Sequence, residues 1–313
     1  MRRAGRLTSL LLPTRSVLDW YQRHRLFTAY DSGILLDRES WFSVTPEAIA
    51  SRMAERCRCH RVLDLFCGAG GNAIQFAMTC ESVVAIDIDP VKVKMARHNA
   101  AIYNVEDRIT FLVGDCTEFV KDVQAASAGA ANSTAKSRWQ GAESLHYDAV
   151  FLSPPWGGVS YTKAASRGDQ RGAAGTSSSL LDESIGGIVV APTATMERVA
   201  PAQEQGQAED EEREHAYYPL SALSPCSGKE LYRLAHSISP NVAMMLPRNS
   251  DLTEIAALPC AAASSSSGED NGIVAVEEQH LGQSFKALAV YFGQLATDWD
   301  EEGYAATTAE AAT

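Results

Sequence analysis

A short loop with two prolines, Ser153-Pro154-Pro155-Trp156, combines residue types suited to holding an amino group and a flat ring. Each proline locks its own φ and restricts the residue before it, so the backbone direction is fixed. The Ser153 hydroxyl and a neighbouring carbonyl can accept hydrogen bonds from an –NH₂ group, and the Trp156 indole can stack on a nucleobase. The alternative is a proline-rich turn with a core Trp. We interpret Ser153, Pro154 and Trp156 as candidate catalytic residues.

A second candidate site is the glycine-rich turn Cys67-Gly68-Ala69-Gly70-Gly71-Asn72, which follows the apolar run 61–66. Glycines let the backbone approach a ligand closely and place the next helix N-terminus over it. The spacing differs from the dinucleotide fingerprint, whose third glycine would fall at Ala73. Asp87 lies 19 residues after Gly68, the interval typical of an acid that binds ribose hydroxyls. These features predict a nucleoside site.

Acidic residues gather at the same predicted sheet edge, because Asp64 lies on the first strand and Asp115 follows the third. An anionic edge disfavours a pyrophosphate and favours a nucleoside with positive charge, such as the sulfonium and ammonium groups of S-adenosylmethionine. The alternative for these acids is a role as strand-end caps and turn formers. We accept that alternative for Asp89 before Pro90, which is typical of a helix cap.

Alternating strands and helices must position these residues. Short apolar runs predict seven strands, at 61–66, 82–88, 109–113, 147–152, 241–246, 273–276 and 285–292. One helix is predicted to begin with Thr45 as its cap and Pro46 at its first position. Further helices are predicted over 73–78, 90–103, 229–237 and 251–258. The last two strands are expected to form a hairpin. The pattern predicts an α/β fold with a doubly wound, mostly parallel seven-stranded sheet and helices on both faces.

The net charge of −12 lies entirely in four segments that are expected to be disordered, so the remaining chain is neutral. Global acidity therefore says little about binding partners. The predicted organisation is a basic arm with a helical extension at 1–60, a main domain at 61–297 with inserts at 125–146, 164–218 and 260–271, and an acidic tail at 298–313. The acidic insert and the tail are candidate surfaces for protein partners.

Seven widely spaced cysteines, an odd number, predict reduced thiols in an intracellular compartment. Cys57-Arg58-Cys59-His60 lacks a second ligand pair at finger-like spacing, so we predict no metal site. The apolar stretches are far shorter than the ~20 residues of a membrane helix, and no membrane span is expected. The first 25 residues carry six arginines and one acid, Asp19. That pattern fits both a transit peptide and a basic arm lying on a polyanion.

Several motifs together resemble the trimethylguanosine synthase family, the cap guanine-N2 members of the class I, Rossmann-like methyltransferases. The glycine turn is shared by many methyltransferases, whereas the Trp form of the Pro-Pro loop combined with 41–47 is far more selective. The matching stretches are 25–27, 36–47, 64–72, 85–90, 151–158, 246–249 and 291–293.

The resemblance implies a fold, a cofactor and a substrate. The cofactor would be S-adenosylmethionine, and the substrate the 7-methylguanosine cap of small nuclear and nucleolar RNAs, methylated twice on its 2-amino group. Methylation at position 7 makes guanine cationic, so stacking on Trp156 gains a cation–π contribution of about 0.5–2 kcal/mol. We expect a monomer, located in the nucleus with some in the cytoplasm.

The resemblance also implies roles for individual residues. Cofactor binding is expected at Thr45, Asp64, Gly68, Gly70, Asn72, Asp87 and Asp115. Substrate binding is expected at Phe27, Trp156, Tyr161, Arg248 and Lys286. Arg248 and Lys286, expected near the cap phosphates, are alternatively solvated strand-end charges. A lysine common in the family's amino-terminal helix is missing here, where the chain reads Val17-Leu18-Asp19, so that contact is lost or moved to Arg23 or Arg25.

Two other functions stay open at this point. One is an amino methyltransferase of guanine or adenine in ribosomal or transfer RNA. The other is a catalytically silent cap-binding module, although the intact set of Asp64, Gly68, Asp87 and Ser153 argues against silence.

Overall fold

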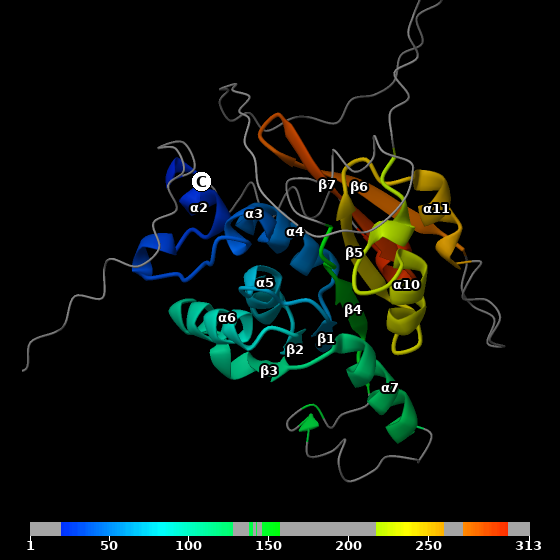
Figure 1. Ribbon diagram of the computed structural model, residues 1–313, viewed down its shortest axis with the longest axis horizontal. Helices are drawn as coiled ribbons and strands as arrows, with labels where there is room; N and C mark the ends of the chain where they lie inside the picture. The colour runs from blue at the N-terminus through cyan, green and yellow to red at the C-terminus, as the bar shows by residue number, and fades with distance from the viewer. Residues whose placement is uncertain are drawn as a thin grey trace, which may run out of the picture.

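A seven-stranded sheet forms the centre of the protein in the computed structural model, which describes residues 20–127, 138–139, 142, 146–156, 217–259 and 272–299. The strand order is β3-β2-β1-β4-β5-β7-β6 (Figure 1). Pairs from β3 through β5 are parallel, β7 is antiparallel to β5, and β6 and β7 form the predicted hairpin. The strands are β1 Arg61–Asp64, β2 Ser82–Asp87, β3 Ile109–Val113, β4 Ala149–Leu152, β5 Val242–Pro247, β6 Val274–Leu281 and β7 Ser284–Phe292.

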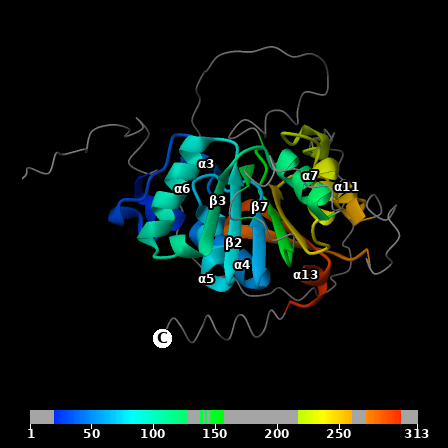
Figure 2. The same cartoon turned by 90° about the horizontal axis from the view of Figure 1, so that it is seen from below.

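Helices cover both faces of this sheet, which confirms the predicted doubly wound α/β fold (Figures 1 and 2). Residues of α4, α5 and α6 pack into one core, and those of α7, α10 and α11 into the other. The helices are α2 Arg23–Leu26, α3 Ser40–Ser43, α4 Glu47–Arg56, α5 Gly71–Thr79, α6 Pro90–Ile102, α7 Cys116–Ser127, α10 Gly228–His236, α11 Leu252–Ala256 and α13 Gln294–Thr297. Within the described ranges, none of them has the length and hydropathy needed to cross a bilayer.

Most predicted element ends agree with the structure within two residues; the first hairpin strand is the exception, since it continues to Leu281. The start of α4 also differs from the prediction. Pro46 has extended backbone angles and is the N-cap, and its carbonyl accepts from Ile49 and Ala50 N–H. Thr45 does not cap the helix, because its hydroxyl accepts a hydrogen bond from Asn72 at 2.9 Å.

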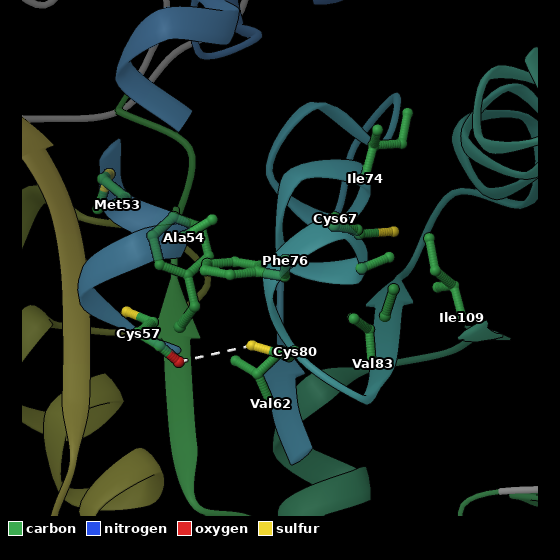
Figure 3. Close-up of a cluster of buried hydrophobic side chains, with 14 of the residues drawn as sticks. Met53, Ala54, Cys57, Val62, Cys67, Ile74, Phe76, Cys80, Val83 and Ile109 are labelled. Carbon is green, nitrogen blue, oxygen red and sulfur yellow. Dashed lines mark hydrogen bonds between the residues drawn. The ribbon is translucent and has the colours of Figure 1, made fainter. Parts of the chain in front are cut away.

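The core beneath α4 and α5 fixes the helix that begins at the glycine turn (Figure 3). Phe76 is fully buried and meets Phe151 of β4 edge-on, with ring centroids 5.1 Å apart. At the end of α5, the Cys80 thiol donates to the Cys57 carbonyl at 3.5 Å. The six cysteines in the described part of the chain are free thiols. Because both ends of α5 are packed, its N-terminus has a fixed direction.

Parts of two predicted inserts are ordered on the domain. Within 125–146, α7 continues to Ser127, and Trp139 is only 5 % exposed, lying edge-on to Phe119 at 5.1 Å. Tyr218, at the end of 164–218, is 3 % exposed. Residues 164–216, all of 260–271 and residues 300–313 of the tail lie outside the described residues.

Candidate active site

The two predicted site motifs lie beside each other at the switch point of the sheet. β1 pairs with β2 on one side and with β4 on the other, so Asp64 is opposite both Ala85 and Phe151. The glycine turn leaves the carboxyl end of β1, and the Ser-Pro-Pro-Trp loop leaves that of β4. In open α/β sheets, ligands bind at this position. The structure therefore brings the candidate cofactor and catalytic residues to one edge.

The turn after β1 requires glycine at several positions. Gly68 and Gly70 have φ values of +51° and +91°, in the left-handed region. A Cβ on Gly70 would lie 3.1 Å from the Cα of Ala96, and one on Gly71 would lie 2.7 Å from Val44 Cγ2. The turn is consequently packed tightly from behind, and α5 begins directly at this edge of the sheet.

Asp87 is held by the glycine turn and its own strand end. One carboxylate oxygen accepts the Gly68 N–H at 2.9 Å, and the other accepts the Asp89 N–H at 2.9 Å. Its side chain is half-buried and keeps lone pairs for further donors. Asp87 thus forms the turn and also suits ribose hydroxyls. Asp89 caps α6 by accepting from Val91 N–H at 2.7 Å, as predicted.

Asp64 carries a buried oxygen without a partner in the described part of the protein. The residue is fully buried, and Oδ1 accepts from Phe66 N–H at 3.1 Å while Oδ2 has no donor. Burial raises the pKa of Asp64 to about 7, the Phe66 hydrogen bond opposes this, and the charge of Asp87 adds to it. An unsatisfied buried acceptor costs about 1–3 kcal/mol, so Asp64 is prepared for a ligand that donates hydrogen bonds or carries positive charge.

Asn72, on the first turn of α5, provides a second oxygen of this kind. Its Nδ2 donates to Thr45, but its buried Oδ1 lacks a partner among the described residues. Thr45 therefore acts through Asn72, orienting the amide. These two unpartnered oxygens and the glycine turn fit the cationic nucleoside cofactor implied by the sequence.

Asp115 and two exposed apolar side chains lie at the same edge of the sheet. Asp115 accepts from Thr117 N–H at 2.7 Å and lies directly before α7. Ile88 and Val113, at the ends of β2 and β3, are 71 % and 49 % exposed. Sequence reasoning missed both, although an apolar residue between Asp87 and Asp89 was a signal. An exposed apolar pair beside acids is suited to the face of a purine.

The indole of Trp156, at the end of the Ser-Pro-Pro-Trp loop, is fixed by a hydrogen bond and by packing. Trp156 Nε1 donates to the Met245 carbonyl on β5 at 3.2 Å, and the ring packs against hydrophobic residues of both cores. Trp156 and Ser153 are half-buried, and Pro154 is buried. Trp156 is thus anchored without being a fully buried core residue. Gly157 and Gly158 lie outside the described residues.

Two exposed cations lie on the strands next to this loop. Pro247 of β5 pairs with Ala287 of β7, so Arg248 and Lys286 are neighbours across the two strands. Both side chains are exposed, and Arg248 donates to the Phe285 carbonyl at 3.5 Å. Like charges opposite each other are unfavourable, although solvent screens exposed ones, so a contact with the cap phosphates stays a prediction.

Three further candidates have different outcomes. Phe27 is 2 % exposed and packs 6.2 Å from Tyr103, close to Gly71, so it fills space behind the glycine turn. Closing a base pocket stays a prediction for Phe27, because its ring is already buried. Tyr161 lies outside the described residues. Arg23 donates to Asp31 at 3.0 Å, which leaves exposed Arg25 as the less engaged cation of the pair.

A buried residue that the sequence did not single out is Asn99, in the middle of α6. Its amide pairs with both backbone groups of Leu35 at 2.8 and 2.9 Å and also donates to the Ala69 carbonyl at 2.9 Å. Asn99 therefore ties the amino-terminal extension to the glycine turn.

The cysteine-rich segment does not form a metal centre in the described chain. Cys59 lies 3.8 Å from Cys80, sulfur to sulfur, and His60 pairs with Glu81. Across the ranges that the structure describes, no three His, Cys, Asp or Glu side chains gather as ligands.

Comparisons with known proteins agree with this geometry. The family model described as RNA cap guanine-N2 methyltransferase matches residues 59–167 and 211–295. Trimethylguanosine synthase of Schizosaccharomyces pombe is 33 % identical over 243 residues, covering 76 % of this chain and 73 % of that protein. The Saccharomyces cerevisiae trimethylguanosine synthase is 30 % identical over 242 residues, covering 75 % of this chain and 56 % of that protein.

A solved structure shows the same fold. A structure described as a methyltransferase from Porphyromonas gingivalis W83 superposes with a TM-score of 0.50 at 13 % identity, covering 88 % of this chain and 48 % of that one. The matched family model and the two relatives confirm the resemblance carried by the motifs, and the chain belongs to the RNA cap guanine-N2 methyltransferase family.

Proposed function

We propose that this methyltransferase converts the 7-methylguanosine cap of small nuclear and nucleolar RNAs to 2,2,7-trimethylguanosine, in the nucleus, with S-adenosylmethionine as donor. The observation that carries the proposal is that an anchored, half-buried Trp156 follows β4 at the same sheet edge as the buried Asp64 of β1, whose Oδ2 lacks a partner among the described residues. Family membership favours the cap over ribosomal or transfer RNA and over a silent cap-binding module.

The cofactor would occupy the edge formed by β1, β2 and β3. S-adenosylmethionine supplies an electrophilic methyl group on a sulfonium. Asp64 and Asn72 offer their unpartnered oxygens to its ammonium group, and Asp87 accepts from ribose hydroxyls. Ile88 and Val113 provide the apolar wall for the adenine.

The chain's contribution to the reaction is mainly alignment. Trp156 stacks on the cationic base, and Ser153 accepts from the 2-amino group so that its nitrogen lone pair faces the methyl donor. Orientation of reactants can account for roughly 7–11 kcal/mol of the barrier. The amine releases its proton after transfer, so no strong base is required among these residues. Arg248 and Lys286 bind the cap phosphates and fix the register of the base.

Mass spectrometry tests the proposal directly. A 7-methylated cap dinucleotide incubated with the full chain and S-adenosylmethionine should gain one and then two methyl groups. A cap dinucleotide lacking the 7-methyl group should react much more slowly, because it loses the cation–π contribution. Methylation of uncapped RNA but not of the cap would support the ribosomal or transfer RNA alternative. Cap binding without methyl transfer would support the silent module.

Replacing Asp87 with alanine should weaken S-adenosylmethionine binding about 10- to 100-fold, since hydrogen bonds to a charged acceptor contribute about 1.5–3 kcal/mol. Titration calorimetry measures this dissociation constant. Asp89→Ala is the matched control, because it removes the α6 cap beside the same turn and should lower stability by about 1 kcal/mol with little effect on cofactor binding. An unchanged dissociation constant in Asp87→Ala would contradict the ribose assignment.

A further inference from the structure

Tyr218 links three segments: the Ser-Pro-Pro-Trp loop, the 3-10 turn Leu220–Ala222 and the turn after β5. It is 3 % exposed and lies two residues before that 3-10 turn. Its hydroxyl is 3.3 Å from the Trp156 carbonyl and 3.0 Å from the Ala222 carbonyl, so its proton can be donated to either. Tyr218 is therefore in direct contact with the backbone of the proposed base-stacking residue.

The backbone of Tyr218 holds the turn that follows β5. Its N–H donates to the Asn249 carbonyl at 2.7 Å, and its carbonyl accepts from Asp251 N–H at 3.3 Å, forming a bridge opposite Ser250. The Ser250 hydroxyl in turn donates to the Pro247 carbonyl at 2.9 Å. The bonded residues, Pro247, Asn249 and Asp251, lie before and after Arg248 in the chain. Tyr218 therefore helps to fix the backbone that carries the Arg248 side chain.

The side chain and backbone of Tyr218 thus connect Trp156, the proposed base contact, to the turn that carries Arg248, the proposed phosphate contact. Trp156 is attached to β5 by its indole at Met245 and to Tyr218 by its carbonyl. A substrate that contacts both Trp156 and Arg248 binds more tightly when their separation is already fixed, because less conformational entropy of the protein is lost on binding. A ligand that uses only one of them gains little.

We propose that Tyr218 is a positioning residue that sets the separation between Trp156 and Arg248, and so favours a 7-methylated guanine joined to a phosphate chain over the bare nucleoside. This inference rests on the proposed function, since it takes Trp156 as the base contact and Arg248 as a phosphate contact. It assigns Tyr218 no contact with substrate. It predicts that the hydroxyl matters for ligands that reach both subsites.

Tyr218→Phe tests this, because it removes the hydroxyl and keeps the ring and the backbone bonds. The matched control is Tyr147→Phe: Tyr147 is 1 % exposed, and its buried hydroxyl has no partner among the described residues. Affinity for 7-methylguanosine and for the 7-methylated cap dinucleotide is measured for both variants, in the native chain and in an Arg248→Ala background. S-adenosylmethionine affinity is measured alongside.

We expect Tyr218→Phe to weaken cap dinucleotide binding about two- to tenfold, the range for one lost hydrogen bond. Nucleoside and S-adenosylmethionine binding should change less than twofold, as should every affinity in Tyr147→Phe. In the Arg248→Ala background the effect of Tyr218→Phe on the dinucleotide should disappear, because the second subsite is already lost. A persistent loss in that background, an equal loss for the nucleoside, or no loss for the dinucleotide overturns the proposal.

A second measurement does not depend on the substrate. Hydrogen exchange of the ligand-free chain should speed up in Tyr218→Phe at 150–156, relative to Tyr147→Phe, because the hydroxyl contacts the Trp156 carbonyl. Exchange at 247–251 should change less, since the variant keeps the backbone bonds to that turn. Unchanged exchange at 150–156 would show that the hydroxyl does not hold this loop. If the native chain fails to bind the cap dinucleotide at all, the proposed function fails, whereas faster exchange at 150–156 would still show that Tyr218 holds the loop.

Discussion

Trp156→Ala is expected to lower kcat/KM for the 7-methylated cap about 30- to 1000-fold while leaving S-adenosylmethionine affinity within about twofold. Stacking of a base on an aromatic ring contributes about 1–3 kcal/mol, and the cationic base adds about 0.5–2 kcal/mol. Together they contribute about 1.5–5 kcal/mol, and the middle of that range, roughly 2–4 kcal/mol, corresponds to this loss of kcat/KM. Steady-state kinetics with a cap dinucleotide and calorimetry with the cofactor provide the two measurements.

Trp156→Phe separates stacking from anchoring. Phenylalanine keeps a flat ring but cannot donate to the Met245 carbonyl, so it should retain much of the cap affinity and lose some precision of placement. The melting temperature of both variants reports the packing lost from the two cores that Trp156 touches. Equal losses of cap and cofactor binding in Trp156→Ala would show that the indole is only a packing residue.

Asp64→Asn is expected to weaken cofactor binding about 100-fold and to abolish its pH dependence. Because burial raises the pKa of Asp64 to about 7, the carboxyl is mostly protonated below that pH in the ligand-free protein. A cationic cofactor binds the ionised form, so native affinity should rise about tenfold per pH unit up to about pH 7 and then level off. Cofactor titrations from pH 5.5 to 8.5 test this, and a flat native profile would contradict it.

The same substitution should stabilise the ligand-free protein at high pH. The folded pKa of Asp64 lies above the usual value of about 4, so its contribution favours folding at low pH and is lost as pH rises from about 4 to about 7. Asparagine avoids the buried charge, and at pH 8 the variant should be more stable by roughly 2–4 kcal/mol. At pH 4 the difference should vanish. Urea unfolding at both pH values measures it, and a less stable variant at pH 8 would exclude a strained carboxylate.

The strands and the glycine turn could be predicted because their signals are local. Apolar runs such as 82–87 and 149–152 are largely buried on both faces of a parallel sheet, so composition alone marks them. The positive φ values at Gly68 and Gly70 likewise leave few residue types acceptable. Together with the selective Pro-Pro-Trp motif, these patterns were sufficient to predict the fold and the family. They also predicted that the glycine turn and the Ser-Pro-Pro-Trp loop belong to the candidate site.

Side-chain partners could not be predicted, because they depend on contacts between distant parts of the chain. Thr45 matched a helix cap in sequence, yet its hydroxyl pairs with Asn72, 27 residues away. Trp139 and Tyr218 lay in segments of polar, low-complexity composition and are nevertheless buried.

The sequence by itself therefore determined which elements form, where the ligand edge lies and which chemistry it suits, since backbone propensity and hydrophobic period act over a few residues. Only the tertiary structure decided that Asp64 Oδ2 lacks a partner within the described ranges and that the Trp156 indole is held by β5. Both outcomes arise when β1, β4 and β5 come together, and no local pattern encodes the distances that result.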